Sequence, residues 1–514
     1  MVSAGRLTVF GCLVLAHLLQ TAAAFGLDDV AARAKALANE PYSRPEVAPQ
    51  FLRDLTQQQY EEIRFKPEAG LWREANSQFQ VLMMAPGNYL THRVRLNQVD
   101  SEGVHTIDYD KNNFTYVNDA FAKRIPADLG YTGFKITFPM GQEAGREAFL
   151  TFGGASYFKA RGQSQVMGQS ARGIAVNTGM SSGEQYPVFV EYWLERPSAR
   201  ADTMRVYALL NGASVTGAYQ FAIYPGEPTR LEVTARLFPR QDIQLLGIAP
   251  LTSMFYYGEN TLRPLGEWRP QVHNSDGLLI NDAESEEWLW RPLINPRDLR
   301  INYLKTKRLA GFGLLQRDRQ FSQFEDLEKR YDLRPSTWIV PKGDWGPGNV
   351  VLVEIPSKAE NNDNIVAFWR SEQPVKAGEE IQREYTLLFG DDTITPNPMA
   401  QAQQTFIGHG DRLGGGTVEN AYRINVDFAG SKLDRLSSTA SVVSSVTPGQ
   451  GVEILEHFVE YVEPEKAWRL SILARPDPEA TLALRAFLSL DDEALTETWT
   501  YDLPAGADIR RTSR

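Results

Sequence analysis

Cysteine is almost missing from this sequence. Among its 514 residues only Cys12 carries a thiol, and it lies in an apolar run that we expect to be removed. The mature chain is therefore expected to have no disulfides, thiolate nucleophiles or cysteine metal sites. Histidine is also scarce, with six residues and no H-x-x-x-H spacing. This argues against a zinc or iron site, and we predict no metal.

Long hydrophobic runs are absent after the first 24 residues. The run from Leu7 to Leu19 (LTVFGCLVLAHLL) follows the single positive charge of Arg6 and precedes the small residues Ala22–Ala24. It is shorter than the roughly 20 apolar residues that cross a bilayer. This pattern predicts a signal peptide at residues 1–24, without a twin-arginine motif, and an exported mature chain with no membrane span.

A positive charge excess is also lacking, since the formal net charge is −11. Nucleic-acid and anionic-membrane binders draw affinity from clustered Lys and Arg, so no nucleic-acid partner is expected. There is no phosphate-binding loop, and Gly168–Arg172 (GQSAR) fails as a nucleophile elbow because Arg172 replaces the required glycine. No cofactor is predicted, and a neutral ligand fits the composition better.

Turn residues divide most of the chain into short alternating segments, which predict an all-β fold. Only Leu27–Asn39 and a piece from Thr56, with Tyr60 and Ile63 on one face, have helical patterns. Strands do not alternate with amphipathic helices, which disfavours Rossmann and TIM-barrel architectures and favours a large sandwich or barrel. At this length at least two domains are expected.

A turn-rich stretch from Gly390 to Met399 indicates a domain boundary. We predict a large β-sandwich at residues 25–391, a linker at 392–404 and a small immunoglobulin-like sandwich at 405–514. The predicted strands of the small sandwich are Tyr422–Phe428, Gly451–Val462, Ala467–Ala474, Thr481–Leu490 and Thr498–Tyr501.

With thiol, metal and serine chemistry disfavoured, carboxylates remain as catalytic candidates. Asp276 and Asp363 each stand among amides or a hydroxyl immediately before an apolar segment that would hold them rigidly. Sugar-bond hydrolysis needs a protonated carboxyl to assist the leaving oxygen and a second group to activate water. The alternative is that both are turn or strand-end residues that bond to their own backbone.

Several long motifs resemble the periplasmic glucan biosynthesis proteins G and D, also called the OpgG/OpgD or MdoG/MdoD family. The resemblance runs from the first helix to the last strand, and the absent twin-arginine signal favours the G type. The motifs are Gly153–Phe158 (GGASYF), Gly247–Phe255 (GIAPLTSMF), Glu287–Pro292 (EWLWRP), Gly311–Arg317 (GFGLLQR), Phe324–Ser336 (FEDLEKRYDLRPS) and Asp363–Trp369 (DNIVAFW).

The resemblance implies a periplasmic protein needed to make osmoregulated glucans with a β-1,2-linked glucose backbone. It also implies a galactose-mutarotase-like sandwich followed by an immunoglobulin-like one. D-type relatives are inverting endo-β-1,2-glucanases, whose general acid would correspond to Asp363, whose base to Asp276 and whose water-positioning tyrosine to Tyr331. Relatives can carry Asp where this chain has Asn274. We expect Asn274 and Asp276 to lie two residues apart in a strand, where both would point to the same face and either could reach one cleft. If Asn274 is the base position, hydrolysis would be crippled while glucan binding survived.

Aromatic and arginine residues supply candidate sugar contacts. Aromatic rings can stack on sugars, but they are also common in strands and cores, and Trp288 and Trp290 share one face of a strand in either case. The arginines could bond sugar hydroxyls or pair with acidic residues, which is their more common use. The candidates are Trp288, Trp290, Trp338, Trp345, Trp369, Arg291, Arg317 and Arg334.

Three functions follow as hypotheses. The leading one is an endo-acting hydrolase or transglycosylase that trims the nascent β-1,2-glucan. The second is a non-catalytic protein that presents the glucan to a branching enzyme or to the inner-membrane synthase. The third is a structural adaptor that docks a membrane partner through its C-terminal sandwich.

Overall fold

The computed structural model describes residues 25–141 and 147–507 and confirms an all-β fold. The predicted signal peptide, residues 1–24, lies outside the described residues. No helix in the described ranges is long and apolar enough to cross a bilayer. The helices are α1 (Leu27–Ala38), α2 (Gln50–Arg53), α3 (Gln57–Glu61) and α4 (Asp119–Arg124).

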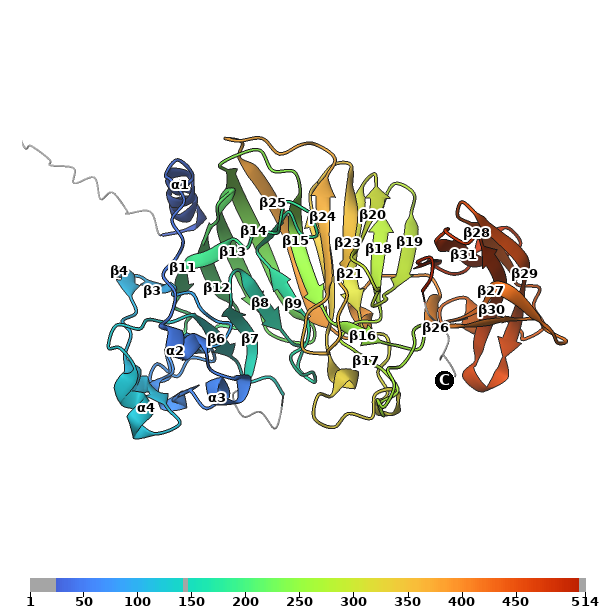
Figure 1. Cartoon of the computed structure of the whole chain (residues 1–514). Helices are drawn as coiled ribbons and strands as arrows, with labels where there is room; N and C mark the ends of the chain where they lie inside the picture. Colours follow the sequence, from blue (N-terminus) through green and yellow to red (C-terminus); the bar gives the residue numbers. More distant parts are fainter. Residues whose placement is uncertain (1–24, 142–146, 508–514) are drawn as a thin grey trace, which may run out of the picture.

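Both predicted helical segments are present. Thr56 caps α3 by accepting the backbone N–H of Gln59, but Ile63 lies beyond the end of that helix. In α1 the side chain of Asp29, rather than Asp28, accepts the N–H of Gly26 at 2.8 Å. The apolar side of α1 packs against Trp193 and its neighbours on one face of the largest sheet, and Figure 1 shows the helix lying beside that sheet.

One large sheet has ten strands and carries the family motifs around residues 153–158 and 363–369. Its neighbouring strands pair antiparallel. Along its path the strands are β2 (Gln80–Met84), β6 (Gly133–Thr137), β7 (Ala148–Gly153), β8 (Tyr157–Ala160), β9 (Ser170–Arg172), β15 (Leu246–Ser253), β24 (Ile365–Ser371), β23 (Gly348–Glu354) and β20 (Arg300–Thr306), with β10 (Ile174–Val176) also paired to β15.

The second large sheet has fifteen strands and continues into the C-terminal part of the chain. In order they are β28 (Val443–Pro448), β31 (Leu482–Leu490), β33 (Thr498–Leu503), β19 (Glu287–Pro292), β18 (Gly277–Asp282), β21 (Leu309–Leu315), β22 (Ser336–Lys342), β25 (Ile381–Gly390), β14 (Thr229–Pro239), β13 (Val215–Tyr224), β12 (Met204–Asn211), β11 (Val188–Glu195), β3 (Arg95–Asp100) and β4 (Gly103–Thr106), with β32 (Glu493–Ala494) paired to β31.

The two large sheets pack face to face around one hydrophobic core. Phe152 and Phe158 from the ten-stranded sheet contact Phe221 of β13, with ring centroids 5.1 and 5.2 Å apart. Strand alternation explains this packing, because every second residue of a strand points to the same face. Along β8, Phe158 and Ala160 point into the core, which leaves Tyr157 and Lys159 on the outer face of the sheet.

A four-stranded sheet and part of the fifteen-stranded sheet enclose a second core in the C-terminal region. All five strands predicted there are present, as β27, β29, β30, β31 and β33, while the predicted linker contains a short helix and the start of β26. The four-stranded sheet consists of β26 (Gln401–Asp411), β27 (Thr417–Ala429), β30 (Ala467–Pro476) and β29 (Val452–Val462).

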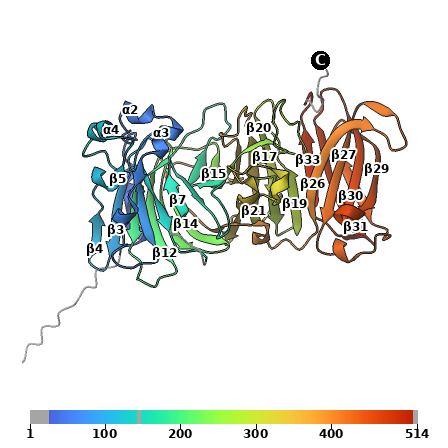
Figure 2. The same cartoon turned by 90° about the horizontal axis from the view of Figure 1, so that it is seen from below.

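The C-terminal strands adjoin the large sandwich directly, at one end of the molecule (Figure 2). Strand β33 pairs parallel with β19, so that Leu289 lies opposite Thr498 and Trp290 opposite Trp499. Two further short pairs, β1 (Arg64–Phe65) with β5 (Phe114–Thr115) and β16 (Phe255–Tyr257) with β17 (Val272–His273), lie outside the main sheets.

Candidate functional site

Asp363 stands at the start of β24, as its position before an apolar strand predicted. The next residue, Asn364, is 2% exposed and holds this point of the chain in place. Its Oδ1 accepts the N–H of Phe255 at 2.9 Å, and its Nδ2 donates to the carbonyls of Phe255 and Ile355 at 3.0 and 3.1 Å. The backbone beneath Asp363 is therefore tied to β16 and to the end of β23.

The Asp363 side chain is exposed to solvent, yet surrounding protein atoms raise its pKa. Both observations hold for a side chain that protein atoms surround on one side and that water reaches on the other. Desolvation is the main cause of the raised pKa, and the positive charges of Lys159 and Arg334 oppose it. Asp363 in turn raises the pKa of two neighbouring hydroxyls, those of Tyr89 and Tyr157.

Lys159 lies on β8, where strand alternation turns it away from the core, and it is near enough to Asp363 for their charges to interact. Desolvation lowers the pKa of Lys159, and the charges of Arg334 and Lys135 lower it further, whereas Asp363 raises it. The group thus combines one carboxyl with two cations that can donate hydrogen bonds. Such donors can bind sugar hydroxyls or stabilise a carboxylate that has lost its proton.

Tyr331 lies beside this group. The guanidinium of Arg334 is 5.4 Å from the Tyr331 ring centroid, and Arg334 donates a hydrogen bond to the carbonyl of Met167. The Tyr331 hydroxyl donates to Glu360 at 3.3 Å. The pKa of Tyr331 is raised, first by desolvation and then by the charge of Glu360. The structure therefore places Tyr331, Arg334 and Asp363 in one region, although they come from two segments of the chain.

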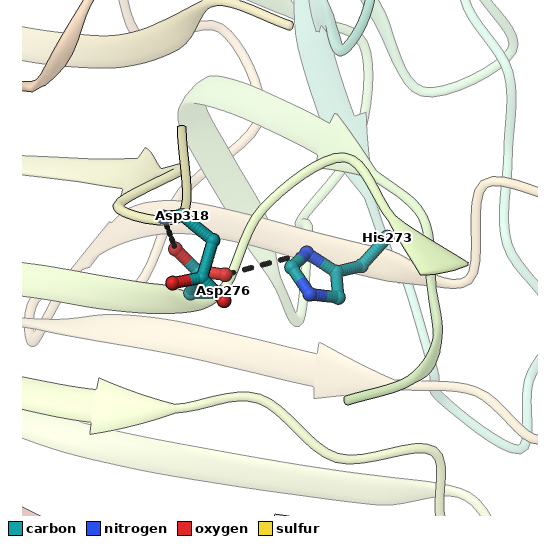
Figure 3. A group of neighbouring side chains, drawn as sticks. All are labelled: His273, Asp276 and Asp318. Atoms are coloured by element: carbon teal, nitrogen blue, oxygen red, sulfur yellow. Dashed lines mark hydrogen bonds and ion pairs between the residues drawn. The ribbon is translucent and has the colours of Figure 1, made fainter. Parts of the chain in front are cut away.

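Asp276 lies immediately before β18, and a second cluster surrounds it (Figure 3). One carboxylate oxygen accepts the backbone N–H groups of Arg317 and Asp318, the second of these at 3.0 Å. The other oxygen faces Nδ1 of His273 at 3.3 Å. Desolvation raises the pKa of Asp276 to about 6, and it lowers that of His273 to about 4.

Asn274 and Asp276 do not lie in a strand, contrary to our expectation. Strand β17 ends at His273 and β18 begins at Gly277, so both residues belong to the connection between them. A shared strand face therefore does not relate them. Asn274 is 8% exposed, and its backbone N–H donates to the carbonyl of Met254 at 2.7 Å.

His273, Asp276 and Asp318 offer possible metal-ligand atoms within 4.8 Å of one another. The hydrogen bonds of these three residues favour protonated groups and their acceptors over metal ligands. Asp318 accepts N–H groups from three carboxamides, those of Gln271, Gln323 and Gln404. Nδ1 of His273 lies 2.9 Å from Oε1 of Gln316, whose Nε2 donates to two carbonyls, so this ring nitrogen is assigned as the protonated donor. A protonated nitrogen cannot ligate a metal.

Comparison with known proteins gives the family. Residues 25–503 match the model of the family described as "Periplasmic glucan biosynthesis protein, MdoG". The chain belongs to this family. It is 41% identical over 506 residues to the "Glucans biosynthesis protein G" of Ralstonia nicotianae, which covers 98% of this chain and 100% of that protein. A role in glucan biosynthesis follows, and the family's name places its members in the periplasm.

The five tryptophans expected as sugar platforms are buried in this family member, which corrects that expectation. Their side chains are 0 to 8% exposed, and they pack in the two main cores. Protein atoms therefore cover the ring faces that a sugar would need. Trp288 and Trp290, the alternating pair in β19, pack in the core and do not face a sugar. The five are Trp288, Trp290, Trp338, Trp345 and Trp369.

Two of the arginines are likewise committed to acidic partners. Arg291 is 2.9 Å from Asp502 and 3.8 Å from Glu354, while Arg317 is 2.6 Å from Glu497. Both are buried, so neither is free for a sugar. Arg334 differs, because it is only partly buried and its charge acts on Asp363.

Four residues around Asp363 and Tyr331 were not predicted as site residues from the sequence: Tyr89, Tyr157, Lys159 and Glu360. Tyr157 lies inside one of the motifs that carry the resemblance, and alternation along the apolar segment 157–160 could have assigned Lys159 to the outer face. No local pattern identifies Tyr89 or Glu360. They join the site only because their loops fold toward the start of β24.

Proposed function

We propose that this chain is a periplasmic glycoside hydrolase that cleaves the β-1,2-linked backbone of glucans during their synthesis, with Asp363 as the general acid. The family's description supports a glucan as the ligand. The observation that carries the proposal is an exposed carboxyl with a raised pKa beside two cations. A general acid must be protonated when substrate binds and must release its proton readily, so burial and nearby cations serve opposite needs.

In this mechanism Asp363 donates its proton to the glycosidic oxygen as the bond to the sugar carbon breaks. Lys159 and Arg334 then stabilise the resulting carboxylate, because opposite charges favour the ionised form. An inverting reaction needs water activated on the opposite face of the sugar, and Asp276 is the proposed base. If a sugar hydroxyl replaces that water, the same site performs transglycosylation.

Tyr331 is the proposed residue that positions water between the two carboxyl groups, Asp363 and Asp276. Its ring lies beside the guanidinium of Arg334, its hydroxyl donates to Glu360, and its carbonyl accepts Nε2 of Gln316 at 3.2 Å. Gln316 in turn contacts His273, the neighbour of Asp276. A carbonyl and a carboxamide do not transfer protons, so in this proposal the proton passes to Asp276 through water molecules that Tyr331 positions.

The second candidate is a glucan-binding protein without hydrolytic activity, which would present the chain to a branching enzyme or to the inner-membrane synthase. The hydrogen bonds of Asp276 favour it, since one oxygen accepts two backbone N–H groups and the other faces His273. Only Oδ1 has no hydrogen-bond partner among the described residues, and the side chain is 15% exposed, so water has little access to the oxygen that could accept its proton.

The first prediction separates the two candidates. The wild-type protein is incubated with linear β-1,2-glucan, and new reducing ends and chain lengths are measured. We expect new reducing ends from the wild type and a loss of about 100-fold or more for Asp363→Asn, because general acids contribute about 10²–10⁴ in rate. The rate should fall as pH rises through the pKa of Asp363, because only its protonated form can act as the acid.

Asp202→Asn is the matched control, since Asp202 is an exposed aspartate in the turn between β11 and β12. It should leave turnover unchanged. Unchanged turnover in Asp363→Asn would remove the acid assignment. Glucan binding by the wild type with no new reducing ends would establish the binding protein in place of the hydrolase.

A further inference from the structure

An arginine sandwiched between two tyrosines lies on the outer face of the ten-stranded sheet. Arg172 of β9 is 2% exposed. Its guanidinium carbon is 5.0 Å from the ring centroid of Tyr157 and 5.1 Å from that of Tyr186. Tyr157 and Arg172 are direct cross-strand partners between β8 and β9. Tyr186 comes from the loop that precedes β11.

Tyr186 is exposed but firmly held. Its side chain is 53% exposed, although Arg172 lies over its ring. Its hydroxyl donates to Oε2 of Glu184 at 3.0 Å. Oε1 of Glu184 accepts hydrogen bonds from Arg172 at 2.8 Å and from Thr178 at 2.7 Å. An exposed ring that is already ordered loses little conformational entropy when a ligand stacks on it.

This stack shares its surface with Asp363. Tyr157 and Lys159 stand two residues apart on β8, so both point to the outer face of the sheet. Lys159 contributes to the electrostatics of Asp363, and Asp363 acts on Tyr157. Arg172 lies opposite Tyr157 on β9 and over the ring of Tyr186, so the stack is level with Tyr157 rather than with Lys159.

We infer that Tyr186, held by Arg172 and Glu184, is a stacking platform for a glucose ring of the glucan at a subsite away from the bond at Asp363. This inference rests on the proposed glucan-binding function. An aromatic ring offers an apolar face to the C–H face of a sugar. Arg172 lies over one side of the Tyr186 ring, and the exposed side is open to the sugar. The hydroxyl is occupied by Glu184, so the ring supplies the contact. The site takes a neutral polysaccharide long enough to reach from Asp363 to Tyr186.

The test measures binding of linear β-1,2-glucan oligosaccharides of increasing length by calorimetry. All proteins carry Asp363→Asn, so that the ligand is not consumed. We expect Tyr186→Ala to weaken binding of long chains about tenfold, in line with the loss of one aromatic contact, and to leave the shortest binding chains unaffected. Tyr186→Phe keeps the ring and should retain most of the affinity for long chains.

Phe406→Ala is the matched control, because Phe406 is 37% exposed and the guanidinium carbon of Arg469 lies 5.6 Å from its ring centroid, but on β26. It should bind every length normally. If Tyr186→Ala binds chains of every length as tightly as the parent protein does, the inference is wrong and the proposed function stands. Equal weakening at all lengths would overturn the separate subsite. Absence of binding by the parent protein at every length would overturn the proposed function itself.

Discussion

Burial raises the pKa of several carboxyl groups here, but their hydrogen bonds give them different roles. Asp363 is open to solvent and has Lys159 and Arg334 as charged neighbours. Asp276 accepts two backbone N–H groups, and Asp318 accepts N–H groups from three glutamines. A raised pKa alone therefore does not identify a catalytic acid. Solvent access distinguishes Asp363 from Asp276 and Asp318.

At this scale we predict the effect of Asp318→Asn on stability. Desolvation and the neighbouring Asp276 raise the pKa of Asp318 from 3.8 to about 6. Between these values the folded state binds more protons than the unfolded state, so this group's contribution to the free energy of unfolding falls as pH rises. Asparagine cannot ionise. Its N–H can be accepted by Oε1 of Gln271, which has no partner among the described residues.

The stability of Asp318→Asn relative to wild type should therefore be higher at pH 7 than at pH 4. The expected difference in the free energy of unfolding is on the order of 1–3 kcal/mol, and thermal melting of both proteins at the two pH values measures it. His273 contributes in the opposite direction, since desolvation lowers its pKa to about 4. The charge of Asp318 raises that pKa, so Asp318→Asn lowers it further, which adds to the expected difference. Asp202→Asn should show no such difference between the two pH values. A constant difference for Asp318→Asn would contradict the prediction.

At the scale of elements, one buried carboxamide joins three strands near the candidate site. Asn364 bonds to both backbone groups of Phe255 in β16 and to the carbonyl of Ile355 after β23, and it lies at the start of β24. Short strands such as β16 have few ladder hydrogen bonds of their own. The side chain of Asn364 thus replaces part of a sheet and fixes the backbone that presents Asp363.

We predict that Asn364→Ala lowers the free energy of unfolding by about 2–5 kcal/mol, because it leaves buried backbone groups without partners. Turnover of β-1,2-glucan should fall as well, since Asp363 is no longer held. Chemical denaturation and the reducing-end assay measure the two effects. Asn361→Ala and Asn362→Ala, at exposed positions of the same loop, should change neither, and a similar loss in those variants would argue against the clamp.

At the scale of the whole molecule, the two cores are joined by a continuous sheet and by a buried ion pair. Arg317 lies 3.5 Å from the Trp290 ring centroid, donates to the carbonyl of Ala402 and pairs with Glu497. Arg317 follows β21 of the large sandwich, whereas Glu497 precedes β33. Removal of the C-terminal region would expose the edge of β19 and leave Arg317 without its partner, so the small sandwich is not a detachable module.

A double-mutant cycle tests this joint. Arg317→Met should lower the free energy of unfolding by about 3–5 kcal/mol, because it leaves Glu497 buried and unpaired. Adding Glu497→Gln should cost much less than it does in the wild-type background, which gives a coupling energy of at least about 1 kcal/mol. Additive effects in urea denaturation would show that the pair does not join the two parts. The exposed pair Arg475 and Glu453 on β30 and β29 is the control, with coupling below about 1 kcal/mol.

Sequence reasoning predicted the all-β class, the first helix, the C-terminal strands and the family because these depend on local patterns. Alternation with period two is readable within one strand, and the motifs around residues 153–158 and 363–369 are contiguous. The positions of Asp276 and Asp363 before apolar strands were predicted for the same reason. Asn274 was assigned to a strand wrongly, since the break between β17 and β18 depends on which strands pair.

Local patterns along the chain are thus enough to give the class of fold, the family and the carboxyl groups worth testing. Which face of each strand is covered, and which side chains from distant segments meet, depends on the packing of the folded chain. Trp288 and Trp290 alternate alike in sequence whether they face a sugar or a core, and packing against the C-terminal strands buries them. Asp363 acquires Lys159 through strand pairing across the ten-stranded sheet and Arg334 through the segment before β22 of the other sheet. Its pKa depends on these spatial neighbours and on solvent access rather than on adjacent residues.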